Sequence, residues 1–167
     1  MDSAVRDAIN GQIKQELFAA YLYLAMSAHF ANKSLEGFAH WMRMQAQEEL
    51  GHAMRLVDYL LERGEPVAFP AVDQPPTSFG SPLSIFEAAL EHEKMVTASI
   101  NRLYALAVEK VDYPTQLVLQ WFITEQVEEE ASSGTVVEQL RMAGDDSASL
   151  LMMDERLGGR VEEAGEA

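Results

Sequence analysis

The chain has 167 residues, 48% of them hydrophobic, and no apolar run long enough to span a bilayer, so we expect one soluble domain with a sizeable core. It contains no cysteine, which excludes disulfides, thiolate zinc sites, iron–sulfur clusters and cysteine nucleophiles, and any metal must be held by oxygen and imidazole nitrogen. The net charge of −15 argues against nucleic-acid binding and favours cations as partners.

Two long helices are predicted in the first part of the chain. From about Ser3 to Ala31, apolar residues recur at helical spacing without an internal proline. The same periodicity runs from about Leu35 to Arg63, where Gly64 and then Pro66 end it. The short turn between the two helices folds the chain back on itself.

The segment from Gly64 to Ser81 contains four prolines and two glycines, so it cannot be helical. A loop of this length inside a compact domain needs a reason. A helix of ~28 residues is ~42 Å long, and about 18 extended residues reach ~60 Å. The loop can therefore cross the whole bundle and start a third helix parallel to the second.

Two more long helices and a short one follow the loop. A proline just after the capping residue Ser81 begins a third helix, which runs to about Val111. Pro114 opens a fourth helix, which continues to about Ala143. A fifth helix, Ser147 to Leu157, is apolar on most sides and needs burial on its own bundle or among neighbouring subunits. We expect an all-α four-helix bundle with one long crossover loop and a short fifth C-terminal helix.

No signal peptide is visible in the sequence, and no membrane is expected as a partner. Met1 is followed by acidic and polar residues rather than a basic stretch and an apolar segment, so a cytoplasmic location is expected. Gly158, Gly159 and an acidic, glycine-containing end indicate a mobile tail. We therefore expect a folded domain over residues 1–157 and a tail over 158–167.

The most informative pair in the chain is Glu49 and His52. They lie three residues apart on one face of a helix and can coordinate one metal ion. Glu16 lies about as far before the first turn as Glu49 lies after it, with a mismatch of only ~2 Å along the bundle. Glu93 and Gln126 lie on the third and fourth helices, at heights that agree to within about one turn. This arrangement indicates a metal centre inside a four-helix bundle.

Five polar residues lie on the apolar stripes of these helices, since residues seven apart on a helix point in nearly the same direction. They are Glu16, Glu49, Glu93, Gln126 and Glu129. Taken singly, each could reach solvent from the edge of its stripe. Several buried carboxylates together would protonate or repel one another, and a divalent cation resolves both problems.

Many di-iron bundles use the Glu-x-x-His pattern twice. Here the second copy is altered, because Gln126-Val127-Glu128-Glu129 offers no histidine. We expect an asymmetric centre, with one metal held by Glu16, Glu49 and His52 and another held by Glu49 and Glu93 with Gln126 nearby. A weaker second position suits a metal that leaves after oxidation.

Four stretches of the sequence resemble bacterial and archaeal non-haem ferritins, and the resemblance extends over essentially the whole chain. The stretches are Glu16 to Tyr23, Ala46 to His52, Glu91 to Glu93 and Gln120 to Glu130. The resemblance implies a ferroxidase centre, with Glu16, Glu49 and His52 for the first iron and Glu49, Glu93 and Gln126 for the second. It implies a third iron site at Glu48, Glu125, Glu128 and Glu129.

The resemblance also implies a function. Two Fe(II) ions would reduce dioxygen or peroxide, and Fe(III) would move as a ferric mineral into a hollow shell of 24 subunits, whose four-fold axes the fifth helices would surround. Tyr23 and Trp121 match aromatic residues that can supply an extra electron, although ordinary core packing is an equal reading. Haem is not expected, because Gln126, Glu129 and Leu50 stand where bacterioferritins have a glutamate, a histidine and a haem-ligating methionine.

Two alternatives stay open on the sequence alone. A rubrerythrin-like di-iron peroxidase would share the centre, but this chain has no cysteine for the electron-relay site of that class. A non-catalytic shell subunit would line a cavity with carboxylates, but such subunits are expected to lose ligands of the first site, and Glu16, Glu49 and His52 are all present.

Overall fold

Capping residues and prolines set where the helices begin. The computed structural model describes residues 1–160, with the helices α1 (Ser3–Ala31), α2 (Glu36–Glu62), α3 (Pro82–Glu109), α4 (Tyr113–Ala143) and α5 (Ser147–Leu157). Four of them begin with a side chain that accepts a hydrogen bond from a backbone N–H of the first turn. These caps are Asp2, Ser81, Asp112 and Asp146. The predicted fold class is confirmed, and the predicted helix ends differ by at most two residues.

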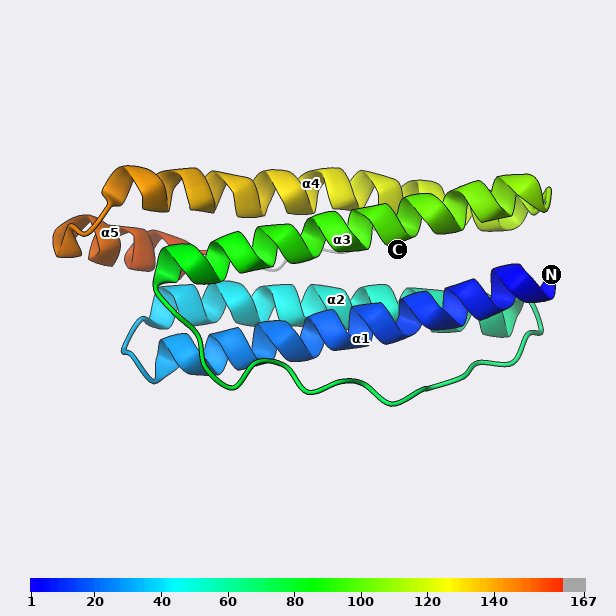
Figure 1. Ribbon diagram of the computed structural model, residues 1–167, viewed down its shortest axis with the longest axis horizontal. Coiled ribbons are helices and arrows are strands. Elements are labelled where there is room, and N and C mark those ends of the chain that lie inside the picture. Colours follow the sequence, from blue (N-terminus) through cyan, green and yellow to red (C-terminus); the bar gives the residue numbers. More distant parts are fainter. Residues whose placement is uncertain (161–167) are drawn as a thin grey trace.

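The helices form two antiparallel pairs, α1 with α2 and α3 with α4 (Figure 1). The crossover between α2 and α3 runs along α1 from one end of the bundle to the other, so that α2 and α3 are parallel as predicted (Figure 1). Near the start of α1, Asn10 Oδ1 accepts a hydrogen bond of 2.7 Å from the Ala68 backbone N–H. Near its end, the rings of His29 and Phe79 lie 5.4 Å apart. The crossover is thus held to α1 at both ends.

The apolar core is divided into two clusters with polar residues between them. One cluster, at the end where α1 turns into α2, includes Phe30 and Phe38. The other, toward the opposite end, includes Ile9 and Leu60. Each long helix has at least one buried glutamate or glutamine in sequence between residues of the two clusters, and these are Glu16, Glu49, Glu93, Gln126 and Glu129. The bundle therefore holds a polar layer near its middle.

The short helix α5 packs on the start of α2. Leu35, which precedes α2, provides no side-chain cap. Instead, the Asp154 Oδ1 atom of α5 accepts a hydrogen bond of 2.9 Å from the Phe38 backbone N–H. Gly37 permits this approach, because a Cβ at that position would overlap the backbone carbonyl oxygen of Asp154. Asp154 of α5 thus provides a hydrogen-bond acceptor for one backbone N–H in the first turn of α2, more than a hundred residues earlier in the chain.

Replacing Gly37 with alanine should displace α5 while the four long helices stay folded. The added methyl group meets backbone rather than a flexible side chain, so the docking contact must open. Hydrogen exchange followed by mass spectrometry should show faster exchange in residues 147–157 at unchanged helix content. Gly51→Ala is the matched control on α2, because a Cβ there meets nothing within 4 Å. Equal protection of α5 in both variants would contradict this account.

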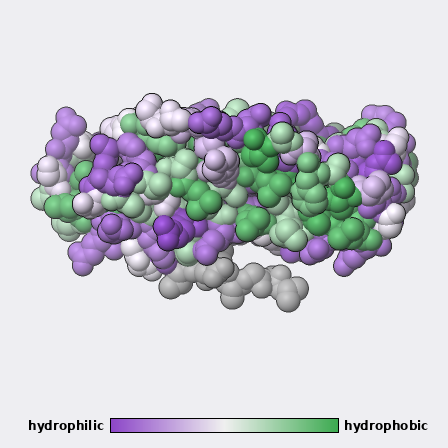
Figure 2. Space-filling view, turned by 90° about the horizontal axis from the view of Figure 1, so that it is seen from below, coloured by the Kyte–Doolittle hydropathy of each residue, from purple (hydrophilic) through white to green (hydrophobic). Residues whose placement is uncertain are grey.

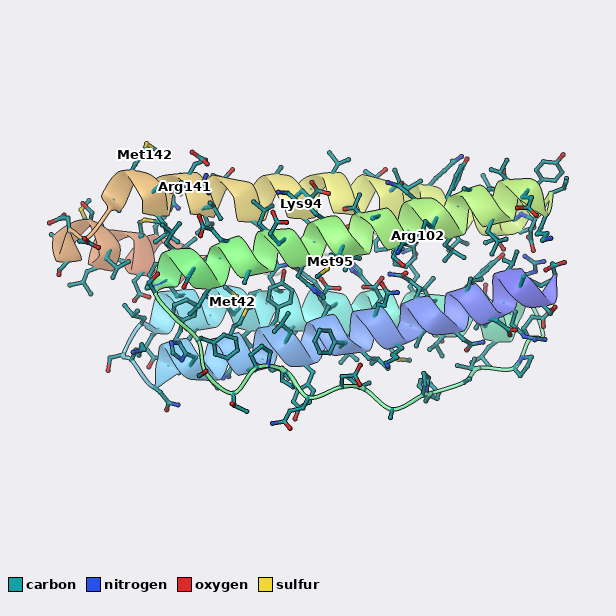
Figure 3. All side chains as sticks on the ribbon, in the orientation of Figure 1. Met42, Lys94, Met95, Arg102, Arg141 and Met142 are labelled. Atoms are coloured by element: carbon teal, nitrogen blue, oxygen red, sulfur yellow. The ribbon has the colours of Figure 1, made fainter. Side chains whose placement is uncertain are left out.

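Large apolar side chains are exposed on several parts of the surface. Figure 2 shows the crossover side of the molecule, where apolar residues gather. The exposed large apolar side chains of α1, α2 and the crossover are Tyr21, Leu24, Leu50, Met54, Leu61 and Phe69. At the end of α4, Met142 points away from the bundle, whereas Met42 is buried within it (Figure 3). Within residues 1–160, no helix is long and apolar enough to cross a membrane.

Candidate metal centre

Helices α1 and α2 bring three predicted ligands together. Glu16 and Glu49 are each 1% exposed, and His52 is 5% exposed. One ligand atom from each of the three lies within 4.8 Å of the others. In the part of the chain that the structure describes, no other three side chains of His, Cys, Asp or Glu form such a group. The spacing of Glu49 and His52 and the turn between the helices explain this convergence.

Four polar atoms of this group lack hydrogen-bond partners within the protein. Both carboxylate oxygens of Glu49, the Oε2 atom of Glu16 and the Nδ1 atom of His52 are buried without a hydrogen bond. Leaving a buried polar atom unsatisfied costs on the order of 1–3 kcal/mol. A cation coordinated by oxygen and nitrogen could take one ligand atom from each of the three residues. The donor set therefore fits a hard or borderline metal ion.

The second half of the centre comes from α3 and α4. Glu93 is fully buried, and its carboxylate accepts a short hydrogen bond from the Tyr23 hydroxyl. The Gln126 side-chain amide donates to the other Glu93 oxygen at 3.3 Å and to Thr97 Oγ1 at 3.3 Å. The negative charge of Glu93 also acts on Glu49. Glu93 and Gln126 therefore lie next to each other, and Glu93 is close enough to Glu49 for their charges to interact.

Burial favours the protonated form of the carboxyl groups. Removal from water raises the pKa of Glu16 to about 7 and that of Glu129 to about 8. Burial, followed by the charge of Glu93, raises the pKa of Glu49 well above its ordinary value. Burial also raises the pKa of Glu93. A metal that binds here must therefore displace protons, so its affinity should rise with pH.

The imidazole of His52 is neutral at neutral pH, which is the form that can bind a metal ion. Burial, assisted by the positive charge of Arg55, lowers its pKa to about 4. Its Nδ1 atom lies 3.4 Å from Glu49 Oε2. The imidazole ring lies edge-on to Trp121, with centroids 5.4 Å apart, and the Arg55 guanidinium stacks over that indole at 3.9 Å. The aromatic contact orients a ring whose nitrogen lone pair is free of a proton at neutral pH.

Two glutamines that the sequence analysis did not single out support the centre. Gln12 donates a hydrogen bond of 2.8 Å to Glu16 Oε1 and accepts one of 2.7 Å from Ser99. Gln45 donates one of 2.7 Å to Glu129 Oε2. Each glutamine lies four residues before a ligand, Glu16 or Glu49, on the same helix face. That repeated spacing is the signal which could have found them.

The four residues that the resemblance assigns to a third iron differ in burial. Glu129 is buried, and the charge of Glu48 contributes to its raised pKa, so the two carboxylates lie near each other. Glu48 and Glu125 are half-buried, and Glu128 is exposed. The structure thus associates Glu48 with Glu129 and leaves Glu128 toward solvent.

The chain is similar to known proteins over most of its length. Residues 6–143 match the ferritin-like domain family. The chain is 41% identical over 156 residues to a bacterial non-heme ferritin of Bacteroides fragilis, covering 93% of this chain and 97% of that protein. It is 40% identical over 160 residues to a bacterial non-heme ferritin of Staphylococcus saprophyticus, covering 96% of each.

Two solved structures of archaeal ferritin are also similar to this chain. A closed form of Archaeoglobus fulgidus ferritin made by site-directed mutagenesis superposes with a TM-score of 0.96 at 45% identity, covering 98% of this chain and 99% of that one. The open-pore ferritin of the same archaeon gives a TM-score of 0.95 at 45% identity, covering 96% and 98%. The chain therefore belongs to the ferritin family.

Proposed function

We propose that this protein stores iron and that it oxidises Fe(II) to Fe(III) within the bundle. Glu16, Glu49 and His52 hold the first Fe(II), and Glu49 with Glu93 and Gln126 holds the second. The observation that supports this most strongly is Glu49, a fully buried carboxylate with two unpartnered oxygens, placed where it can bridge the two positions. A bridging carboxylate has one oxygen for each metal ion.

The electron count requires two metal ions and an oxidant. Two Fe(II) ions supply two electrons, which reduce dioxygen to hydrogen peroxide with uptake of two protons, or peroxide to water. The Tyr23 hydroxyl donates a hydrogen bond to Glu93, which holds the phenol next to the second position. It is our candidate for an additional electron donor, with Trp121 beside His52 as a second one.

The oxidised iron needs a way out of the centre. We assign Glu48, Glu125, Glu128 and Glu129 to a third iron position. These residues range from buried at Glu129 to exposed at Glu128. A graded series of carboxylates lets Fe(III) move toward solvent without losing its oxygen ligands. The single amide at Gln126 makes the second position the weaker one, which favours departure from it.

Storage requires assembly of the subunits. We propose a hollow shell of 24 copies in the cytoplasm, filled with ferric mineral. Exposed apolar side chains support association, since a monomer rarely leaves so many uncovered. They lie on α1, α2 and the crossover (Figure 2) and also on α5, where Leu151 is 60% and Met152 72% exposed. Burial of these side chains between copies would cover both surfaces.

The direct test adds Fe(II) to metal-free protein in air, follows ferric absorbance by stopped flow and measures particle size by light scattering. We expect rapid, saturable oxidation of two irons per chain, then slower accumulation in a particle of several hundred kilodaltons. Rapid oxidation in a small oligomer would retain the centre and remove storage. Turnover of peroxide without ferric accumulation would instead favour a di-iron peroxidase. Oxidation no faster than without protein would contradict both activities.

A further inference from the structure

Arg160, just beyond α5, returns to α2 and makes five contacts there. Its Nη2 atom donates to the two Glu48 carboxylate oxygens at 2.8 and 3.1 Å. Its Nη1 atom donates to Gln45 Oε1 in a short hydrogen bond. The guanidinium lies over the Trp41 ring at 4.9 Å, and the backbone carbonyl oxygen is 2.7 Å from His40 Nε2. The start of the expected tail is thus anchored to α2 at this residue.

These contacts place a positive charge beside Glu48 and near Glu129, two of the four carboxylates that we assign to the third iron position. The Arg160 and Glu48 side chains are each only 19% exposed, so solvent screens their ion pair less than it screens a surface pair. Gln45 receives a hydrogen bond from Arg160 and donates one to Glu129. Arg160 is therefore paired directly with Glu48 and linked through one amide to Glu129.

We propose that Arg160 is a built-in counter-ion of the third iron position, which an incoming metal ion must displace from Glu48 before it can bind there. The proposal rests on the proposed function, because it concerns regulation of a position assigned under it. A guanidinium remains charged at any pH the protein meets, so protonation cannot release it. An incoming cation therefore competes with Arg160 for Glu48 at every pH. A trivalent ion competes for the carboxylates more strongly than a divalent ion, so displacement favours Fe(III) over Fe(II).

The size of the effect follows from the fraction of time that Glu48 is unpaired. The apparent affinity of a ligand falls by the fraction of its site that is ready to bind it. If Arg160 leaves Glu48 unpaired about one tenth of the time, metal affinity at this position falls about tenfold. Loss of Arg160 should restore that factor. Arg160 therefore sets how readily a metal ion occupies this position.

The test measures terbium(III) binding to the full-length, metal-free protein by luminescence, with no iron or oxidation involved. Arg160→Gln should bind terbium about tenfold more tightly at this position than the unaltered protein. The control is Arg156→Gln, which also removes one positive charge close to Arg160 in the sequence. Arg156 is suitable because its hydrogen bond is to Gln139 and not to a carboxylate of the third iron position. In a Glu48→Gln background, Arg160→Gln should no longer change the affinity.

Three results would overturn the proposal: a change of less than twofold in Arg160→Gln, an equal gain in Arg156→Gln, or a full gain that persists without Glu48. A second readout uses the stacking on Trp41. In a Trp121→Phe background Trp41 is the only tryptophan, and terbium should change its emission when Arg160 is present but much less in Arg160→Gln. If Fe(II) is not oxidised but the terbium difference remains, the proposed ferroxidase fails while the counter-ion stands.

Discussion

A Glu49→Gln protein should lose rapid Fe(II) oxidation while folding into the same helices. The substitution keeps the shape of the side chain but replaces the carboxylate, which we assign to both metal positions, with a neutral amide. Loss of a bridging ligand should exceed the 10–100-fold losses typical of residues that only support metal ligands, so we expect a drop of about 100-fold or more in the initial rate. Stopped-flow ferric absorbance measures this rate, and circular dichroism monitors the helices.

The control for this variant is Glu62→Gln, which removes one charge from an exposed position on the same helix. Glu62→Gln should oxidise Fe(II) at the rate of the unaltered protein. Oxidation by Glu49→Gln at that same rate would contradict the assignment of the centre to this layer of the bundle. Equal slowing in both variants would show an effect of net charge on iron attraction rather than on ligation.

The parts of the fold that follow local rules were predictable from the sequence. Prolines, glycines and capping residues end or begin a helix within a few neighbouring positions, so the five helices could be located. The meeting of Glu16, Glu49 and His52 was also predictable, because it depends on the spacing within one helix and on equal distances from one short turn.

Other contacts join residues that no periodicity relates. Asp154 and Phe38 are 116 positions apart, and Arg160 and Glu48 are 112 apart. Both contacts form because α5 packs against the start of α2. That packing requires Gly37, where a side chain would overlap the backbone of α5, and no pattern within α5 itself predicts it. The spacing of Gln45, one turn before Glu49, could have suggested a supporting role, but its hydrogen bond to Glu129 on α4 could not be predicted from that spacing. The anchoring of Arg160 was not expected from the sequence, and the rest of the predicted tail, residues 161–167, lies outside the described residues.

The metal centre occupies the place where a continuous apolar core would otherwise stabilise the bundle. Buried carboxyl groups between two apolar clusters are tolerated in the metal-free protein only while they are protonated. A bound cation replaces those protons and makes the charged form favourable. In the function we propose, metal binding and the stability of the metal-free protein therefore have opposite preferences for pH, and both depend on buried carboxyl groups such as Glu16 and Glu49.

The metal-free protein should accordingly become less stable as the pH rises from 6 to 8.5. Glu16 and Glu129 have folded-state pKa values of about 7 and about 8, above the ~4.3 of an unfolded glutamate. The folded state then binds more protons, so this stabilisation is complete below pH ~4.3 and disappears as the pH rises through 7 and 8. We expect a loss on the order of 1–3 kcal/mol for each group, visible by calorimetry as a lower Tm.

Zinc(II), which is redox-inert, should reverse this loss, and it should raise the Tm more at pH 8.5 than at pH 6 because fewer protons oppose its binding. Glu49→Gln should show a smaller pH dependence without metal, since its amide does not ionise, whereas Glu62→Gln should behave like the unaltered protein. A Tm that rises between pH 6 and 8.5 in the metal-free protein would mean that the buried carboxylates are already ionised. In that case another positive charge or ordered water must satisfy them, and zinc would be expected to stabilise the protein equally at both pH values.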